Sequence, residues 1–354
     1  MSGPLSGLRV IEIGSIGPGP FAAMMLADHG ADVIRIDRPG APPSDKDALL
    51  RSRRSITLDL KNADDVSTLR ALVRTADALI EGFRPGTMER LGIGPDTLMA
   101  DNPRLIYGRM TGWGQTGPYA PYAGHDINYI AMAGALHAIG PAERPVPPLA
   151  LAGDFGGGGM LLAFSITAAL LNTAQTGRGQ IIDCAMTEGA GLLMAAFYSG
   201  LVEGWWDNKR ASNFTDGGAH FYGAYETLDG HFVAIGAIEP QFYAQLIERL
   251  GLSDEVELDA QMEKASWPGL RDKIAAVIKR KTRAEWCAIM EYSDLCFAPV
   301  LSLTEAPYHP HAVARQAFVK INDIVQPAPA PRFSVTPLDA PHALRRVDPA
   351  DLGV

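Results

Sequence analysis

The 354-residue chain is long enough for more than one compact domain, and 47% hydrophobic with 20% charged residues is the composition of a globular protein. Its formal net charge of −9 argues against a nucleic-acid-binding surface or an anionic-membrane surface spread over the molecule, although it leaves room for one local anion site. Three cysteines without Cys-x-x-Cys spacing predict neither a disulfide framework nor a metal centre.

The N-terminus lacks the basic start and apolar run of a signal peptide. The longest apolar stretch, residues 160–171, is shorter than the roughly 20 residues that a bilayer-spanning helix needs. We therefore expect a cytoplasmic protein with no membrane span and no nucleic-acid partner.

The first 110 residues predict alternating strands and helices. Short β-rich runs are separated by helix-like segments at 21–29 and 63–74, and this β-α-β order is typical of a parallel, Rossmann-like sheet. The strands are expected at 8–13, 31–37, 55–60, 78–81 and 104–108.

The rest of the chain predicts a second, smaller α+β domain. Small apolar residues predict helices over 126–138 and 158–173, a strand follows at 180–184, and a long helix spans 187–202. Strands at 222–227 and 231–236 flank an Asp-Gly turn, and helices begin near 241, 271 and 283. The predicted organisation is a large domain at 1–186, a linker helix and excursion at 187–221, a small domain at 222–310, and a return segment at 311–354 that packs on the large domain.

The loop Gly17-Pro-Gly-Pro-Phe-Ala22 has the outline of a dinucleotide fingerprint, because it follows a strand, opens a helix and precedes Asp37 at the end of the next strand. Pro18 and Pro20 remove amide donors from the loop that would hold a pyrophosphate, which favours a tight turn between helix and sheet. An NAD-dependent dehydrogenase stays open as an alternative.

Basic residues cluster in the N-terminal third of this acidic chain. Such side chains bind phosphates, but they also occur in solvated surface salt bridges, and the charge pattern alone does not separate these interpretations. The cluster comprises Arg35, Arg38, Arg51, Arg53, Arg54, Lys61, Arg84 and Arg90.

Three glycine-rich motifs each place an ionisable residue at an expected element end. His125 lies in Gly-His-Asp, Asp154 precedes a run of glycines after Phe155, and Glu239 lies in Ala-Ile-Glu-Pro. Any one of them is commonly a helix cap or a satisfied polar group, so the three together carry the information.

These motifs, with Val33-Ile-Arg-Ile-Asp-Arg-Pro39, Glu81-Gly-Phe-Arg-Pro-Gly86 and Thr111-Gly-Trp-Gly-Gln-Thr-Gly-Pro118, resemble the family III CoA-transferases over residues 5 to about 335. Within that family the chain is most similar to the branch that racemises 2-methylacyl-CoA thioesters. The resemblance implies a large α/β domain joined by two linkers to a smaller domain, in an interlocked homodimer. It implies coenzyme A bound as part of the acyl-CoA substrate, with no separate cofactor and no metal.

The resemblance also implies roles for individual residues. His125 and Asp154 match the two acid/base residues, and Glu239 matches the carboxylate that pairs with the histidine, an arrangement that would join two chains if the small domain supplies it. The positions that match coenzyme A contacts are Arg38, Leu58, Asp59, Leu60, Lys61, Gly82, Phe83, Arg84, Arg90, Gly124, Asp126, Ile127, Asn128 and Tyr129.

The chemistry of these residues suits 1,1-proton transfer on the carbon beside a thioester carbonyl. Such a reaction needs an acid/base on each face of the carbon and donors for the enolate oxygen, which the amides of a helix beginning at 126–129 would supply. We expect a dry pocket to raise the pKa of Asp154, and the glycines after it to let the substrate carbon approach closely. The alternatives are a CoA-transferase with a covalent intermediate on Asp154, the dehydrogenase named above, and a non-catalytic coenzyme A-binding relative.

Overall fold

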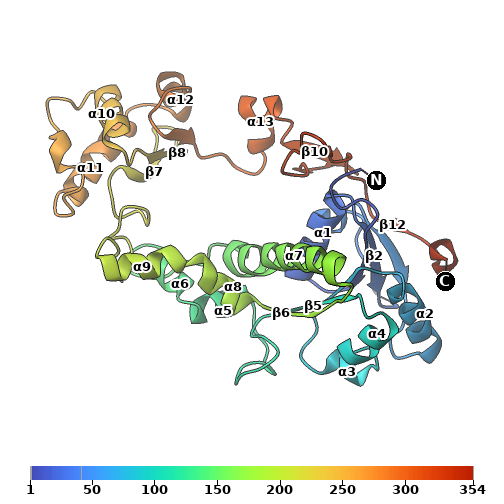
Figure 1. The fold of residues 1–354 in the computed structure, drawn as a ribbon. Helices are drawn as coiled ribbons and strands as arrows, with labels where there is room; N and C mark the ends of the chain where they lie inside the picture. The colour runs from blue at the N-terminus through green and yellow to red at the C-terminus, as the bar shows by residue number, and fades with distance from the viewer. Residues whose placement is uncertain (1, 41, 354) are drawn as a thin grey trace. The chain divides into compact units, whose positions relative to one another are not determined.

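The computed structural model describes residues 2–40 and 42–353, and the chain divides into two compact units (Figure 1). The first unit comprises the chain up to residue 135, residues 149–194 and the chain from residue 309 onward. The second comprises residues 136–148 and 195–308. Residues 136–148, expected in the large domain, therefore group with the second unit, whereas residues 187–194 of the expected linker group with the first.

A seven-stranded parallel sheet forms the centre of the first unit, in the order β12-β3-β2-β1-β4-β5-β6. The six strands expected from the sequence are confirmed, each within a few residues. Their bounds are β1 (Arg9–Ile13), β2 (Asp32–Asp37), β3 (Arg54–Thr57), β4 (Ala78–Glu81), β5 (Ile106–Thr111), β6 (Ile181–Ala185) and β12 (Arg345–Arg346).

The strand order reverses between β1 and β4, because β1 pairs with β2 on one side and with β4 on the other. The chain therefore leaves the carboxyl ends of β1 and β4 toward opposite halves of the sheet, and open α/β sheets bind ligands in the crevice at such a reversal. The loops at this point begin at Gly14 and Gly82.

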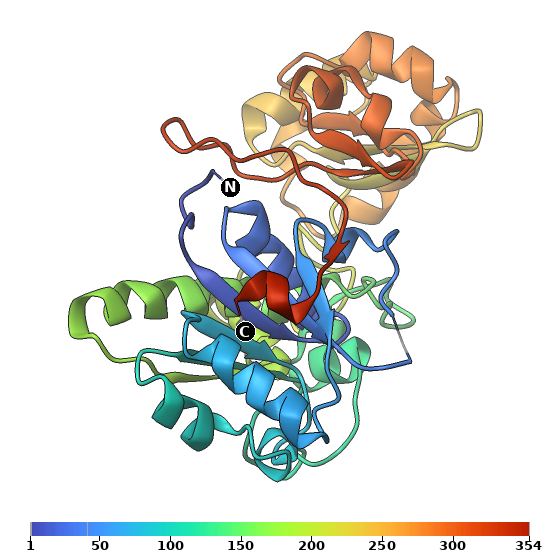
Figure 2. The same ribbon diagram turned by 90° about the vertical axis from the view of Figure 1, so that its right-hand side faces the viewer.

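Helices cover both faces of this sheet, because successive residues of a strand point to opposite faces. Val10 and Ile80 pack with α1 and α7 in one apolar cluster, whereas Ile11 and Leu79 pack with α2 and α4 in another. Figure 2 shows the C-terminal η5 (red) near the strands, and its Leu352 belongs to the second cluster. The helices of this unit are α1 (Pro18–Asp28), η1 (Ala48–Leu50), α2 (Ala63–Val73), α3 (Thr87–Arg90), α4 (Pro95–Asp101), α5 (Asp126–Met132), the π-helix η2 (Leu151–Met160), α7 (Leu161–Thr176), α8 (Met186–Leu193), α13 (Pro310–Ala314) and η5 (Pro349–Leu352).

The C-terminal residues return to the sheet. A hairpin of β10 (Phe318–Ile321) and β11 (Ile324–Pro327) precedes an extended stretch, and β12 then pairs in parallel with β3. Gln326 accepts a hydrogen bond from the buried Arg51 at 3.1 Å, so a polar contact also joins the hairpin to the N-terminal part of the first unit.

The second unit is an α+β unit with its own apolar core. Its three-stranded antiparallel sheet runs in the order β7-β8-β9, and Phe221, Tyr243 and Trp286 are among its fully buried side chains. Its elements are α9 (Ala195–Glu203), β7 (Tyr222–Glu226), β8 (Phe232–Gly236), α10 (Pro240–Arg249), η3 (Leu258–Ala260), α11 (Trp267–Ile278), α12 (Arg283–Met290), β9 (Phe297–Pro299) and η4 (Ala306–Tyr308), while α6 (Ala135–Ala138) begins in the first unit.

Two helical segments differ from the sequence-based expectation. The helix expected over 187–202 ends at Leu193, and α9 begins after Met194. The apolar segment near residue 160 is longer than expected, because η2 continues into α7 and the two span Leu151–Thr176. By length and composition alone this segment could cross a membrane, yet η2 packs closely against α1 and α8, as a core helix does. The segment is therefore weak evidence for a membrane span.

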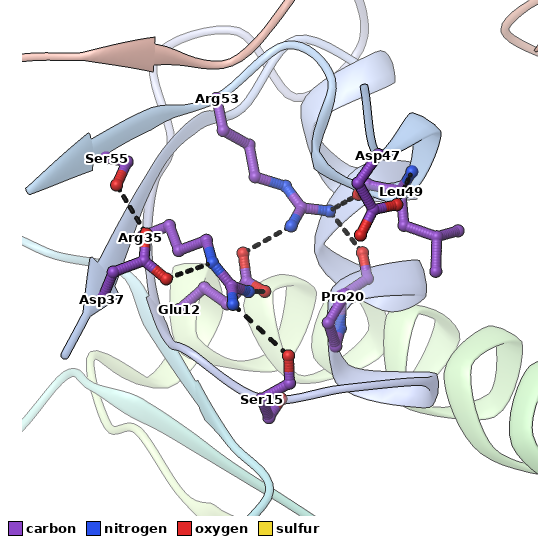
Figure 3. Close-up of polar contacts among 9 residues, drawn as sticks. All are labelled: Glu12, Ser15, Pro20, Arg35, Asp37, Asp47, Leu49, Arg53 and Ser55. Atoms are coloured by element: carbon purple, nitrogen blue, oxygen red, sulfur yellow. Dashed lines mark hydrogen bonds and ion pairs between the residues drawn. The ribbon is translucent and has the colours of Figure 1, made fainter. Parts of the chain in front are cut away.

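A buried ionic network joins β1, β2 and β3 to the start of α1 (Figure 3). The Glu12 carboxylate is fully buried and accepts from Arg35 at 2.5 Å and from Arg53 at 2.6 Å. Arg35 also donates to Asp37 at 2.8 Å, and Arg53 donates to the carbonyl oxygen of Pro20. Burial lowers the pKa of Arg53, while the charge of Glu12 opposes that effect.

We predict that Arg53→Met destabilises the first unit by about 3–5 kcal/mol, because it leaves Glu12 charged and partly unpaired in the interior. The matched control is Lys320→Met, which breaks the exposed pair with Asp323 and should change stability by less than about 1 kcal/mol. Urea unfolding followed by circular dichroism measures both. Equal unfolding midpoints for the two variants would contradict this assignment of the network.

Candidate active site

The first of two neighbouring cavities has a volume of about 600 Å³ and lies at the carboxyl ends of β1, β2 and β4. Its walls include the loops after β1 and β4 and the segment after β3. Arg38 and Lys61 supply its positive charge, while Leu58, Leu60, Phe83 and Leu91 supply apolar wall. A cavity with both kinds of surface suits a ligand that combines a flat apolar ring with phosphate groups.

The second cavity, about 460 Å³, contains the two candidate acid/base residues. His125 and Asp154 line it together with Tyr129, Arg84 and Trp113. It shares Ser15, Ile16, Gly82 and Phe83 with the first cavity, so the two adjoin at the reversal of strand order. A ligand that lies along both would place its anionic end near Lys61 and its other end near Asp154.

Most of the residues predicted to contact coenzyme A line one of these cavities. Arg90 lies on the exposed side of α3, where it donates to Thr87 at 3.0 Å, and it is not among the lining residues of either cavity. Asp126, Ile127 and Asn128 do not line them either. The predicted residues in the first cavity are Arg38, Leu58, Asp59, Leu60, Lys61, Gly82 and Phe83, and those in the second are Gly82, Phe83, Arg84, Gly124 and Tyr129.

The basic cluster of the N-terminal third separates into two groups. Arg51 is buried against Asp28 at 2.5 Å, Arg53 against Glu12, and Arg54 pairs with Asp32 at 2.5 Å. Neither a phosphate site nor a solvated surface describes Arg51 and Arg53, because carboxylates of the same unit neutralise them in the interior, whereas the pair of Arg54 with Asp32 is partly exposed. Arg38 and Lys61 are exposed and line the first cavity, so they are the cations available to a ligand there.

Asp37 and the loop at residues 17–22 match the dinucleotide fingerprint in sequence but lack the free polar groups that such a site uses. In nucleotide-binding sheets the acidic residue at the end of the second strand accepts the ribose hydroxyl. Here both oxygens of Asp37 are engaged, one by Arg35 at 2.8 Å and the other by Ser55 at 2.6 Å. Pro18 is the first residue of α1, three residues before the expected start, and it offers no amide N–H. The geometry therefore disfavours NAD.

His125 immediately precedes α5, with an extended backbone. Its N–H donates to the Asn128 side chain at 3.0 Å, and its carbonyl oxygen accepts from the amides of Asn128 and Tyr129 at 2.8 and 3.3 Å. Backbone contacts on both sides hold the residue, and its exposed imidazole faces the second cavity. Two of the amides expected to face an enolate oxygen are thus used within α5.

Asp154 lies within the π-helix η2, an uncommon element that recurs at functional sites. Burial raises the pKa of this carboxyl, the charge of Asp126 raises it further, and the charge of His125 lowers it. A Cβ atom on Gly17 would lie 3.1 Å from Asp154 Oδ2, so the loop before α1 approaches this carboxylate closely. The expected direction of the pKa shift agrees with the structure.

The glycines after Asp154 have a different role from the one expected. A Cβ atom on Gly157 would lie 2.5 Å from the Ala190 amide nitrogen, and one on Gly159 would lie 2.7 Å from the Phe21 ring. These glycines therefore let α8 and α1 pack against η2, and the expectation that they admit a substrate carbon is wrong for them. Their effect on Asp154 is to fix the helix that carries it.

Glu239 lies in the second unit, immediately before α10, and its side chain is exposed. Its carbonyl oxygen accepts from the amides of Phe242 and Tyr243 at 3.0 Å, which fixes the residue at the start of the helix. Within residues 2–40 and 42–353, no group of three or more His, Cys, Asp and Glu side chains is arranged to hold a metal ion.

Sequence reasoning overlooked several residues that line the second cavity. Ser15 and Ile16 lie in the loop after β1, and Met186 begins α8, so these residues reach the cavity from two separate parts of the fold. Trp113 packs edge-on against Tyr129 with ring centroids 4.8 Å apart. The reversal of strand order would have indicated Ser15 and Ile16, but it becomes known only once the strands are paired.

Comparisons with known proteins agree with this architecture. The chain is 47% identical to the α-methylacyl-CoA racemase of Mus musculus and 46% identical to that of Homo sapiens, in each case over 94% of this chain and 87% of the relative. It is 32% identical to the succinyl-CoA–L-malate CoA-transferase α subunit of Chloroflexus aurantiacus, over 94% of this chain and 84% of that subunit.

A crystal structure of a CAIB/BAIF family protein from Brucella suis superposes with a TM-score of 0.82 at 27% identity, covering 96% of this chain and 95% of that one. Residues 5–353 match the sequence profile of CoA-transferase family III. The chain is therefore a member of CoA-transferase family III.

Proposed function

We propose that this protein is an α-methylacyl-CoA racemase, which interconverts the (2R) and (2S) forms of 2-methylacyl-CoA thioesters. The observation that carries the proposal is the 46–47% identity to racemases of that name over 94% of the chain. The geometry supports it, because His125 and Asp154 line one cavity that adjoins a second, cationic one.

The reaction removes the proton on the carbon beside the thioester carbonyl and returns a proton to the opposite face. His125 and Asp154 approach the second cavity from different elements, α5 and η2, which suits a substrate carbon held between them. One residue accepts the proton as the other donates one, so each direction of the reaction uses both side chains.

The shift in the pKa of Asp154 favours this exchange. An ordinary aspartate side chain, with a pKa near 3.9, is a weak base. Burial raises the pKa of Asp154, and the charge of Asp126 raises it further, so its carboxylate is a stronger base than an ordinary aspartate.

The enolate oxygen needs a donor in the same cavity. The amides of Asn128 and Tyr129 donate to the His125 carbonyl oxygen and are not free for this role, and neither Asp126 nor Ile127 lines the second cavity. The coenzyme A part of the substrate would lie along the first cavity, with its phosphates near Arg38 and Lys61. We propose no separate cofactor, because both proton carriers are side chains.

We predict that the wild-type protein exchanges the α-proton of 2-methyldecanoyl-CoA for deuterium in heavy water without an acyl acceptor, as nuclear magnetic resonance would show. His125→Ala and Asp154→Ala should each lose exchange by about 100-fold or more, because each removes one acid/base. Full exchange in either variant would remove that residue from the scheme.

The same assay separates the racemase from a CoA-transferase. A transferase forms a covalent intermediate on Asp154, which hydroxylamine traps, and it requires a second carboxylic acid. Trapping at Asp154 together with absence of exchange would replace the proposed function by the transferase.

Gly17→Ala tests the close approach of the α1 loop to Asp154. We expect α-proton exchange to fall by about 10-fold or more, because the new Cβ atom would lie 3.1 Å from the carboxylate oxygen. Gly92→Ala is the matched control, because Gly92 has a similar φ of 73° but open space where its Cβ atom would lie. Equal loss in both variants would assign the effect to backbone strain.

We also propose that the protein is a homodimer in the cytoplasm. The first unit exposes large apolar side chains on neighbouring helices, and burying them against a second copy would remove this surface from water. The three cysteines are free, as expected of a reducing compartment. The exposed side chains include Met132, Leu151, Met160, Phe164, Leu171 and Leu192, between 51% and 70% exposed.

In this dimer we propose that Glu239 of one copy pairs with His125 of the other. Mixed dimers of His125→Ala with Glu239→Gln should then regain activity, because one of the two sites receives both native residues. Neither variant alone should be active. Mixing after reversible dissociation and measuring α-proton exchange tests this, and mixed dimers without activity would place the two residues of each site on the same chain.

A further inference from the structure

Asp126 connects the two elements that carry the acid/base residues. It directly follows His125 and is the first residue of α5, and the residue as a whole is 9% exposed. One oxygen, Oδ1, accepts from the amides of Gly153 and Asp154, each at 2.8 Å. The same side chain thus caps the first turn of η2 from the start of α5.

The packing around this contact leaves little freedom. A Cβ atom on Gly153 would lie 2.3 Å from Asp126 Oδ1, so only glycine allows the carboxylate to approach both amides. Asp126 does not line either cavity, although its sequence position matched a coenzyme A contact. A role in ligand binding therefore does not account for its burial and its two hydrogen bonds.

We propose that Asp126 is a positioning residue that sets the separation of His125 and Asp154. Its backbone is bonded directly to that of His125, and its carboxylate accepts a hydrogen bond from the backbone amide of Asp154. The two contacts together fix one acid/base residue relative to the other. The inference rests on the proposed function for its catalytic consequences, but the contact itself is independent of the reaction.

The Asp126 carboxylate is also the neighbouring charge that disfavours ionisation of Asp154. The other groups facing Asp154 are His125 and Tyr129 on α5, Arg84 after β4, which lines the same cavity, and the uncharged loop at Gly17 before α1. On the remaining elements packed against η2, Arg109 of β5 is paired with Glu81 and Glu89, Asp183 of β6 accepts from the Gln115 amide, and Glu188 of α8 is exposed. Removing the negative charge of Asp126 should therefore lower the pKa of Asp154.

The experiment compares Asp126→Asn, Asp126→Ala and Gly153→Ala with the wild type by α-proton exchange over a range of pH. Asp126→Asn keeps an acceptor oxygen but loses the negative charge. Its exchange rate at the optimal pH should stay within about 10-fold of the wild-type rate, and the part of the pH–rate profile that reports the titration of Asp154 should move to lower pH. Asp126→Ala loses both amide contacts, so kcat should fall by about 100-fold with KM within about threefold.

Gly153→Ala displaces the carboxylate without removing its charge, and should lower kcat as Asp126→Ala does. The control is Asp348→Ala, which removes another carboxylate that accepts an N-terminal amide, that of Ala350 at 3.0 Å in η5. It should leave both kcat and KM unchanged. A KM that rises at constant kcat in Asp126→Ala would overturn the proposal and return Asp126 to the coenzyme A contacts.

Backbone hydrogen–deuterium exchange separates failure of this inference from failure of the proposed function. In Asp126→Ala, the peptide that covers η2 should lose amide protection near Gly153 and Asp154, whether or not the protein is a racemase. Unchanged protection would overturn the positioning role, even if the variant folds and loses activity. A wild type that shows no α-proton exchange would contradict the proposed function alone.

Discussion

The reversal of strand order between β1 and β4 is the constraint on which the site depends. Because β2 and β4 lie on opposite sides of β1, the loops that begin at Gly14 and Gly82 diverge and leave a crevice between them. Both cavities share residues of these two loops. The cationic cavity and the acid/base cavity are therefore neighbours as a consequence of sheet topology, and the chemistry is added by the elements that reach the crevice later in the chain.

Much of this fold could be predicted from the sequence, because buried parallel strands are short β-rich runs and glycines, Gly30 and Gly177, mark the ends of α1 and α7. The sequence pattern does not show which carboxylate pairs with which basic side chain. In the sequence, Arg51 and Arg53 look no different from Arg38, because all three belong to the same basic cluster. In the structure, Asp28 neutralises Arg51 and Glu12 neutralises Arg53, and both carboxylates come from other elements. Only pairing of the strands determines which arginines remain for a ligand.

The glycines of η2 illustrate the same limit. A glycine run beside an aspartate suggests a close approach of some kind, and Gly157 and Gly159 are indeed required for close approach. The approaching groups are α8 and α1, because the run forms a π-helix that packs against both of them. The sequence indicates that something approaches these glycines closely, but it does not show which group does so. In the same way, resemblance to a family identified His125 and Asp154, whereas the contact of Asp126 with η2 became known only from the structure.

The environment of Asp154 also bears on how one family supports two kinds of chemistry. A transferase uses this carboxyl as a nucleophile, which has to be ionised, whereas a racemase needs it to gain and lose a proton with similar ease. Burial and a like charge from Asp126 both disfavour the carboxylate, and the charge of His125 partly restores it. The balance of these three contributions suits proton exchange. The residue that disfavours ionisation also hydrogen-bonds the backbone of Asp154, so the geometry and the protonation of the site are set by the same side chain.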